Sequence, residues 1–134
     1  MGCRGNTPER QPLQDELSRV PLVRTEHGLG LPRRPVTALF LHGEHDFGSR
    51  AIVGDALAMV HSDVLVDLSW CTFIDSAVIA LLLAKHVELE GHGYRLELIV
   101  PPTHVQLSRT FDRLGARALV PVHDAPPSIE RLAP

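Results

Sequence analysis

A serine and an aspartate stand side by side where a predicted buried strand and a short loop lead into a long apolar helix. They are Asp75 and Ser76, in the segment VDLSWCTFIDSAVIALLL. Backbone N–H groups and the helix dipole stabilise negative charge at a helix N-terminus. A serine hydroxyl in that place can carry a phosphate, which adds about −1.5 to −2 charges. It can equally serve as a plain N-cap, which contributes about 1 kcal/mol to its helix.

Three aspartates lie at or near the carboxyl ends of predicted strands, and they are Asp46, Asp67 and Asp75. In open α/β sheets, functional sites form at this edge. Paired carboxylates there could perform general acid–base catalysis, but that needs a raised pKa for which the sequence offers no cause. Aspartates in such places more often cap the helix or turn that follows them.

The common signatures of enzymes with alternating strands and helices are absent from the sequence. It contains no G-x-G-x-x-G after a strand, no G-x-x-x-x-G-K-[ST] and no G-x-S-x-G. Eight histidines are present, but His42 and His45 would face opposite sides of a strand, and no cysteine pair joins them. We therefore expect no enzymatic activity, no cofactor and no metal site.

Length, composition and charge narrow the class of protein further. The chain has 134 residues, 44% of them hydrophobic, which fits one domain with a sizeable core. The net charge is −3 and aromatic residues make up only 4%, so we expect no nucleic-acid partner. Cys3 and Cys71 make no disulfide framework, which favours a cytoplasmic location. The longest apolar run, residues 77–84, is too short for insertion across a membrane.

Apolar periodicity and turn residues divide the chain into predicted elements. Predicted strands cover residues 20–26, 36–42, 64–68, 95–100 and 118–122. Predicted helices cover residues 50–61, 76–90, 104–114 and 126–132, with Ser49 and Thr103 as caps of the first and third. The Gly/Pro-rich GLGLPRRP would form the long loop of a hairpin between the first two strands. We expect residues 1–19 to be a disordered arm, with at best one helical turn around residues 15–19.

This order of elements predicts the fold class. Strands separated by helices of 10–15 residues imply βαβ crossovers and a largely parallel sheet. The hairpin would add one antiparallel edge. We therefore expect an α/β fold over residues 20–134, a single domain with a mixed, mostly parallel sheet and helices packed on it.

The segment around Ser76 resembles the signature of STAS domains, the anti-sigma factor antagonist family. The family pattern is D-L-S, a few residues, F-I-D-S, a small residue, glycine and an apolar helix, and this chain has DLSWCTFIDSAV. Upstream, LHGEHDF is similar to the family's strand end L-x-G-E-L-D, and downstream LELIVPPTHVQLSRTFDRLG is similar to its strand, turn and helix. The resemblance covers roughly residues 36–123, and more loosely 20–132. It implies a STAS-like fold.

The resemblance also implies partner switching. Unphosphorylated antagonists of this family bind an anti-sigma factor with serine kinase activity and free a sigma factor. Phosphorylation of the serine that matches Ser76 releases the antagonist, and a phosphatase would reverse the step. Asp46 and Asp75 match acidic positions beside that serine. Ser69 and Thr72 lie in the same predicted loop, as further partner-binding residues and weaker phosphosite candidates.

Two residues depart from the family pattern. Val78 stands where the family usually has glycine, and His45 stands where it has the leucine of G-E-L-D. Val78 adds bulk near the helix start, where it could exclude or change a partner. The departures motivate an alternative function, a non-phosphorylated interaction or ligand-sensing module of a signalling or transport complex. No feature of the sequence specifies an oligomeric state.

Overall fold

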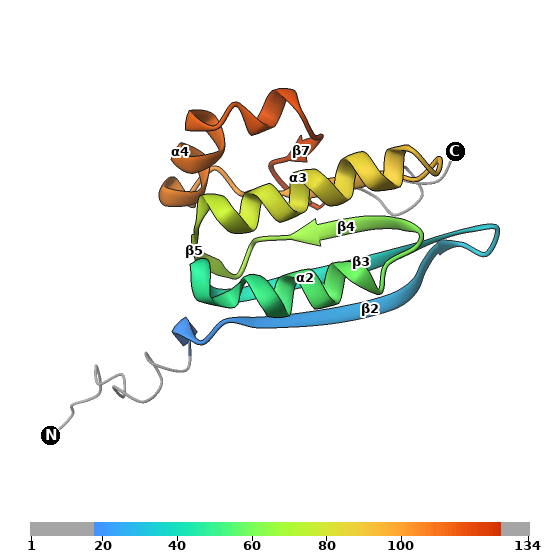
Figure 1. The fold of residues 1–134 in the computed structure, drawn as a ribbon, viewed down its shortest axis with the longest axis horizontal. Helices are drawn as coiled ribbons and strands as arrows, with labels where there is room; N and C mark the ends of the chain where they lie inside the picture. Colours follow the sequence, from blue (N-terminus) through green and yellow to red (C-terminus); the bar gives the residue numbers. More distant parts are fainter. Residues whose placement is uncertain (1–17, 127–134) are drawn as a thin grey trace, which may run out of the picture.

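The computed structural model describes residues 18–126, which form one sheet with helices packed on it (Figure 1). Within these residues the sheet has six strands in the order β2-β3-β4-β6-β7, and β5 pairs with β3 off this path. The strands are β2 (Leu22–Leu31), β3 (Arg34–His45), β4 (Asp63–Asp67), β5 (Cys71–Ile74), β6 (Leu96–Ile99) and β7 (Val122–His123). The helices are α2 (Arg50–Ala58), α3 (Ser76–Glu90) and α4 (Val105–Arg113), with short 3-10 helices η2 (Phe47–Ser49) and η3 (Ala116–Ala118).

The antiparallel edge of the sheet is the hairpin of β2 and β3, as predicted. Its register runs from Leu22 opposite His42 to Leu31 opposite Arg34. The prediction of a long loop was wrong, because β2 continues through the GLGL segment. Gly28 and Gly30 take positive φ angles of 75° and 80°, and the register shifts between Glu26 and Leu29. Glycines that the sequence indicated as a turn thus form an irregularity within the strand.

The remaining pairings are parallel. β3 pairs with β4, β4 with β6, and β6 with β7. Each of these pairs is joined by a segment that contains a helix, as parallel neighbours require. Right-handed crossovers that proceed in one direction across a sheet place their helices on one face, and Figure 1 shows α2 and α3 on the same face. The predicted mixed, mostly parallel α/β fold is confirmed.

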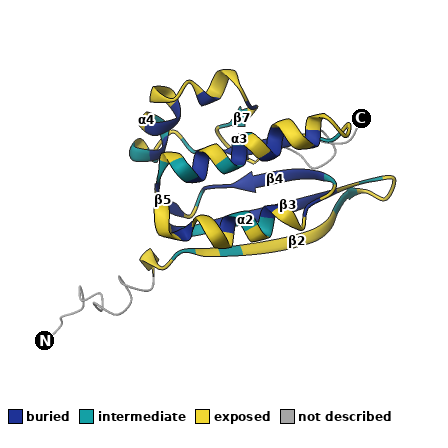
Figure 2. Cartoon of the chain, in the orientation of Figure 1, coloured by how far each residue is buried: buried dark blue, intermediate teal, exposed yellow. Residues whose placement is uncertain are grey.

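One hydrophobic core joins this face of the sheet to all three α-helices. Figure 2 shows that β4 is buried along its whole length, whereas the outer sides of the helices are exposed. Burying one large aliphatic side chain contributes about 1.5–3 kcal/mol. The core includes Leu39, Val66 and Leu98 from the strands and Val53, Leu57, Ile79, Leu82, Leu107 and Phe111 from the helices.

Several predicted boundaries were wrong towards the C-terminal end of the domain. The expected cap Thr103 is displaced by His104, which precedes α4 and makes no side-chain capping bond. The strand expected over residues 118–122 is replaced by η3 and the two-residue strand β7. Gly115, with a φ of 67°, ends α4 and starts η3, so the chain keeps turning where the apolar run suggested a strand.

Some expectations concern residues outside the described range. The arm over residues 1–19 falls there except for Ser18 and Arg19, which are helical, and most of the terminal helix over 126–132 does as well. Among residues 18–126, no helix is long and apolar enough to cross a membrane.

Two substitutions on α3 test the packing. Leu82 is fully buried in the core, whereas Val87 on the same helix is 67% exposed. Leu82→Ala should lower the free energy of unfolding by about 2–5 kcal/mol, because it removes buried methyl groups and leaves a cavity. Val87→Ala should change it by no more than about 0.5 kcal/mol. Urea unfolding measures both, and equal losses in the two variants would contradict the assignment of the inner face.

Candidate functional site

The strand position beside β3 is occupied by two consecutive segments. β4 pairs with residues 36–40 of β3, and β5 pairs with residues 43–45 further along. Between them the chain turns at residues 68–70, where the Ser69 N–H donates to Asp67 Oδ1 at 2.8 Å. Gly43 N–H donates to the Trp70 carbonyl at 3.0 Å and starts the second pairing. The sequence predicted a plain loop here, but a short strand carries the chain to α3.

Gly43 is required at this position for two reasons. Its φ is +83°, which residues with side chains rarely adopt. A Cβ on Gly43 would also collide with the carbonyl group of Val20, because the chain entering β2 passes directly over it. Both constraints act at the residue where the pairing of β3 with β5 begins.

Asp75, rather than Ser76, caps α3. Asp75 has an extended backbone, and its Oδ1 accepts a hydrogen bond from Ala77 N–H at 2.7 Å. Ser76 is the first residue of the helix and is exposed. Within residues 18–126, its hydroxyl makes no hydrogen bond. The interpretation of Ser76 as a plain N-cap was therefore wrong, and its side chain has no capping role.

The other predicted site residues lie at different distances from Ser76. Asp75 N–H donates to the His45 carbonyl at 2.9 Å, which brings the exposed Asp46 next to the start of α3. Thr72 is exposed on β5, about 13 Å back along the chain at a strand rise of roughly 3.3 Å per residue. Ser69 is half-buried in the turn before β5. The structure thus groups Asp46, Asp75 and Ser76, and places Thr72 and Ser69 further away.

The two departures from the family pattern both point inwards. Val78 is 0% exposed and belongs to the hydrophobic core. His45 is also 0% exposed; its Nε2 lies 3.0 Å from the His42 carbonyl and its Nδ1 lies 3.1 Å from Ser49 Oγ. A carbonyl oxygen can only accept, so Nε2 carries the proton. The bulk of Val78 therefore lies behind the site and does not itself reach a partner.

The Ser49 side chain bonds to groups in the interior beside His45 and does not cap α2. Its oxygen lies 3.1 Å from both the Asp46 carbonyl oxygen and His45 Nδ1, two acceptors that share its single hydroxyl proton, and it makes no side-chain capping bond to the helix. His45 and Ser49 together hold the backbone that presents Asp46 at the surface. Burial lowers the pKa of His45, because desolvation disfavours the imidazolium form.

Sequence reasoning missed Gln106 of α4. Its Oε1 accepts from Ile74 N–H at 3.0 Å, and its Nε2 donates to the Ile74 carbonyl at 3.1 Å. Ile74 directly precedes the Asp75–Ser76 pair. The one signal in the sequence is the spacing of Gln106 and Thr110, two polar residues one helical turn apart beside the apolar Leu107 and Phe111.

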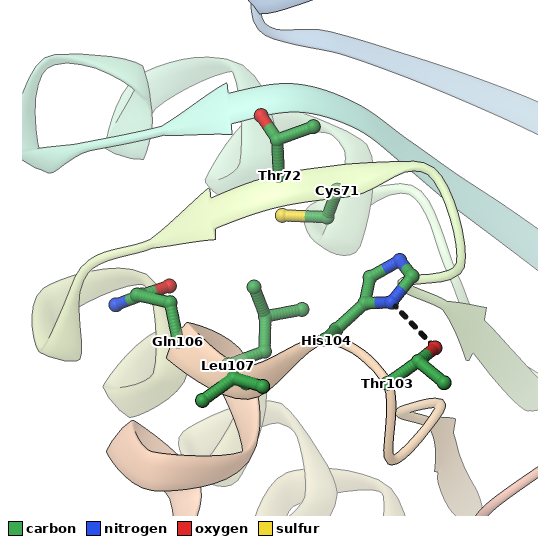
Figure 3. A pocket seen from close by; sticks show the side chains of 7 residues that line it. Cys71, Thr72, Thr103, His104, Gln106 and Leu107 are labelled. Carbon is green, nitrogen blue, oxygen red and sulfur yellow. Dashed lines mark hydrogen bonds between the residues drawn. The ribbon is translucent and has the colours of Figure 1, made fainter.

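A pocket of about 260 Å³ lies between β5 and the start of α4, and Figure 3 shows the side chains that line it. His104 closes one end, with its Nε2 2.6 Å from the Ser69 carbonyl. The Cys71 thiol donates to the Phe73 carbonyl at 3.1 Å, and burial raises its pKa to about 11. Such a thiol stays protonated near neutral pH and is a poor nucleophile. Thr72 points to the opposite side of β5 (Figure 3).

Metal chemistry finds no support in the arrangement of ligands. His42 is half-buried and stacks on Trp70, with ring centroids 6.3 Å apart, whereas His45 is buried. Across residues 18–126, no group of three His, Cys, Asp or Glu side chains could hold a metal ion.

Comparisons with known proteins define the class. The family model described as "Mlab, STAS domain" matches residues 33–121, and the chain belongs to this family. The structure is similar to an anti-sigma factor antagonist from Mycobacterium paratuberculosis, with a TM-score of 0.63, 19% identity, and coverage of 79% of this chain and 86% of that one. A putative anti-sigma factor antagonist from Thermotoga maritima gives a TM-score of 0.56, 15% identity, and coverage of 66% and 80%. These likenesses concern the fold. No curated protein matches the chain.

The buried His45 predicts a loss of stability in acid. Its pKa is lowered in the folded state, so below the ordinary value near 6.5 the unfolded chain binds the proton more readily. Stability should therefore fall as the pH drops from 7 to 5, by at most about 1.4 kcal/mol per pH unit for this one proton. His45→Leu should show a smaller fall over the same range in urea unfolding. The same pH dependence in both proteins would contradict the role of His45.

The buried Cys71 predicts resistance to thiol reagents. In a Cys3→Ser variant, Cys71 is the remaining cysteine of the chain. At pH 8 the folded variant should react slowly with a disulfide reagent, because burial holds the pKa of Cys71 at about 11. Labelling should become fast in denaturant. Equally fast labelling in the folded protein would show that the β5–α4 contact is open.

Proposed function

We propose that this protein is an anti-sigma factor antagonist whose binding to an anti-sigma factor with serine kinase activity is switched by phosphorylation of Ser76. The observation that carries the proposal is the exposed hydroxyl at the first position of α3, with Asp75 performing the capping in its place. The names of the two similar structures support the choice of partner. The chain would be the substrate of the kinase and not itself an enzyme.

The charges around Ser76 support the proposal that a phosphate there would weaken partner binding and leave the fold intact. A phosphate on Ser76 would lie beside the first N–H groups of α3, where the helix dipole favours negative charge. The same phosphate would add charge to a surface that already holds Asp46 and Asp75. An acidic partner group that tolerates the hydroxyl would be repelled. The switch would thus act on the interface, and a phosphatase would restore it.

Exposed aromatic side chains accompany the segments that flank the site. Phe47, Trp70 and Phe73 are 57%, 63% and 36% exposed. They are three of the six aromatic residues in the chain. Phe47 begins η2, directly after Asp46, and Trp70 and Phe73 lie next to and within β5, which leads to Asp75. Aromatic side chains dominate the binding energy of many interfaces. With Ser69 and Thr72, they would extend the contact beyond Asp46, Asp75 and Ser76.

The energy needed for a switch is modest. A transient interface of this kind buries on the order of 1,200–2,000 Å². If phosphorylation costs about 3 kcal/mol of binding free energy, affinity falls more than about a hundredfold. The step would take place in the cytoplasm, where ATP is available to the kinase.

A second candidate function is an interaction or ligand-sensing module that works without phosphorylation, in a signalling or transport complex. A groove of about 480 Å³ favours it. The groove runs beside Trp70 and Leu22, and its lining is completed by Ser18, Val20, His42, Gly43 and Thr72. Under this alternative, Trp70→Ala would weaken partner binding while changes at Ser76 would not.

Substitutions at Ser76 distinguish the two functions. Ser76→Asp should weaken binding to the anti-sigma kinase by at least about tenfold, because it adds a negative charge at the interface. Ser76→Ala should bind as the wild type does and resist labelling by radiolabelled ATP. Ala118→Asp, which adds the same charge at an exposed position of η3, is the matched control and should bind normally.

Titration calorimetry with the purified partner gives the affinities, and circular dichroism checks that each variant is folded. Normal binding by Ser76→Asp, or undiminished labelling of Ser76→Ala, would overturn the proposal.

A further inference from the structure

Ile74 lies two positions before Ser76, on β5. On the edge of β5 that faces away from β3, its backbone pairs with a side chain instead of a neighbouring strand. β6 accompanies β4 only as far as the pairing of Asp67 with Ile99. Beyond that point, both backbone polar groups of Ile74 are bonded to the Gln106 amide, at 3.0 Å and 3.1 Å. One donor and one acceptor exchanged with a single residue is the pattern of a neighbouring strand. Gln106 therefore completes the edge of β5.

The Gln106 amide is itself held in one orientation. Its Nε2 also donates to Thr110 Oγ1 at 2.9 Å. The Thr110 hydroxyl in turn donates to the backbone carbonyl oxygen of Gln106, also at 2.9 Å. Thr110 is 3% exposed, and Leu107 and Phe111 anchor the same helix in the core. Because these bonds restrict its rotation, the Gln106 side chain couples the position of α4 to that of β5.

A second hydrogen bond holds the opposite side of the same short segment. Asp75 N–H donates to the His45 carbonyl at 2.9 Å, and Asp75 then caps Ala77 at 2.7 Å. Ile74 is thus fixed by α4, Asp75 by β3, and Ala77 by the cap. Ser76 lies between these fixed points, with an exposed side chain.

We infer that Gln106 is a positioning residue for Ser76. It fixes the position and orientation in which the Ser76 hydroxyl is presented to the kinase. The inference rests on the proposed function, since it concerns phosphorylation of the same serine. Phosphoryl transfer depends strongly on the placement of the attacking oxygen. Loss of the Gln106 bonds would loosen Ile74 and Asp75, and so change turnover more than partner affinity.

The test compares four full-length proteins: wild type, Gln106→Met, Thr110→Val and Arg109→Ala. Methionine keeps the length of the side chain without its amide, and valine removes the hydroxyl that orients Gln106. Arg109 is exposed on the same helix and is the matched control. Site-resolved amide hydrogen exchange reports the Ile74 and Asp75 N–H groups. Steady-state phosphorylation by the purified serine kinase partner reports turnover and the Michaelis constant for the chain.

Gln106→Met should speed Ile74 exchange at least about tenfold, and Thr110→Val by a smaller factor in the same direction. Turnover should fall in the same order, at least about tenfold for Gln106→Met, with the Michaelis constant within about twofold of wild type. Arg109→Ala should match wild type in both measurements. A residue that merely stabilises the fold would leave turnover unchanged well below the melting temperature.

Two outcomes would overturn the inference: unchanged Ile74 exchange in Gln106→Met, or faster exchange with wild-type turnover. Failure of the proposed function looks different, because the wild-type chain itself would not be phosphorylated. In that case the exchange data alone decide whether Gln106 holds the start of α3.

Discussion

Hydrogen bonds on two sides of one short segment determine where Ser76 lies. The chain must leave a buried parallel strand and enter a helix whose first turn faces solvent. Every backbone polar group on that path needs a partner. The His45 carbonyl supplies one on the β3 side, and the Gln106 amide supplies two on the α4 side. The capping by Asp75 then leaves the serine side chain outside the hydrogen-bond network of the fold.

The two departures from the family pattern change the interior and leave the outer surface of the site alone. Val78 adds its volume to the core between α3 and the sheet, and His45 replaces an apolar contact with bonds to Ser49 and the His42 carbonyl. A substitution that points inwards affects stability and its dependence on pH. It affects a partner only through shifts of the backbone. Neither departure belongs to the exposed set of Asp46, Ser76 and the aromatic residues.

Local signals in the sequence were sufficient for the elements that such signals control. The helix over residues 76–90 was predicted with its observed bounds, because an aspartate precedes it, an apolar run fills it and a glycine follows it. The parallel sheet followed from the alternation of strands and helices. The exposure of Ser76 and the capping role of Asp75 could not be separated in advance, since both residues are good caps.

The misses share a physical cause, which is dependence on tertiary partners. β5 has four residues and exists because β3 extends past β4 to pair with it. Gln106 could not be assigned to Ile74, because the two residues are 32 positions apart and the bond depends on how α4 docks. The GLGL segment contains two glycines that favour a turn, yet pairing with β3 keeps it in the strand.

Mapping of phosphate on the protein isolated from its own cells tests the central claim most directly. Tandem mass spectrometry of the peptide containing residues 69–76 would separate the three candidate hydroxyls, Ser69, Thr72 and Ser76. The account predicts phosphate on Ser76 in the released chain and an unmodified Ser76 in the chain bound to its partner. Phosphate on Ser69 or Thr72 in place of Ser76, or an unmodified Ser76 in both fractions, would contradict it.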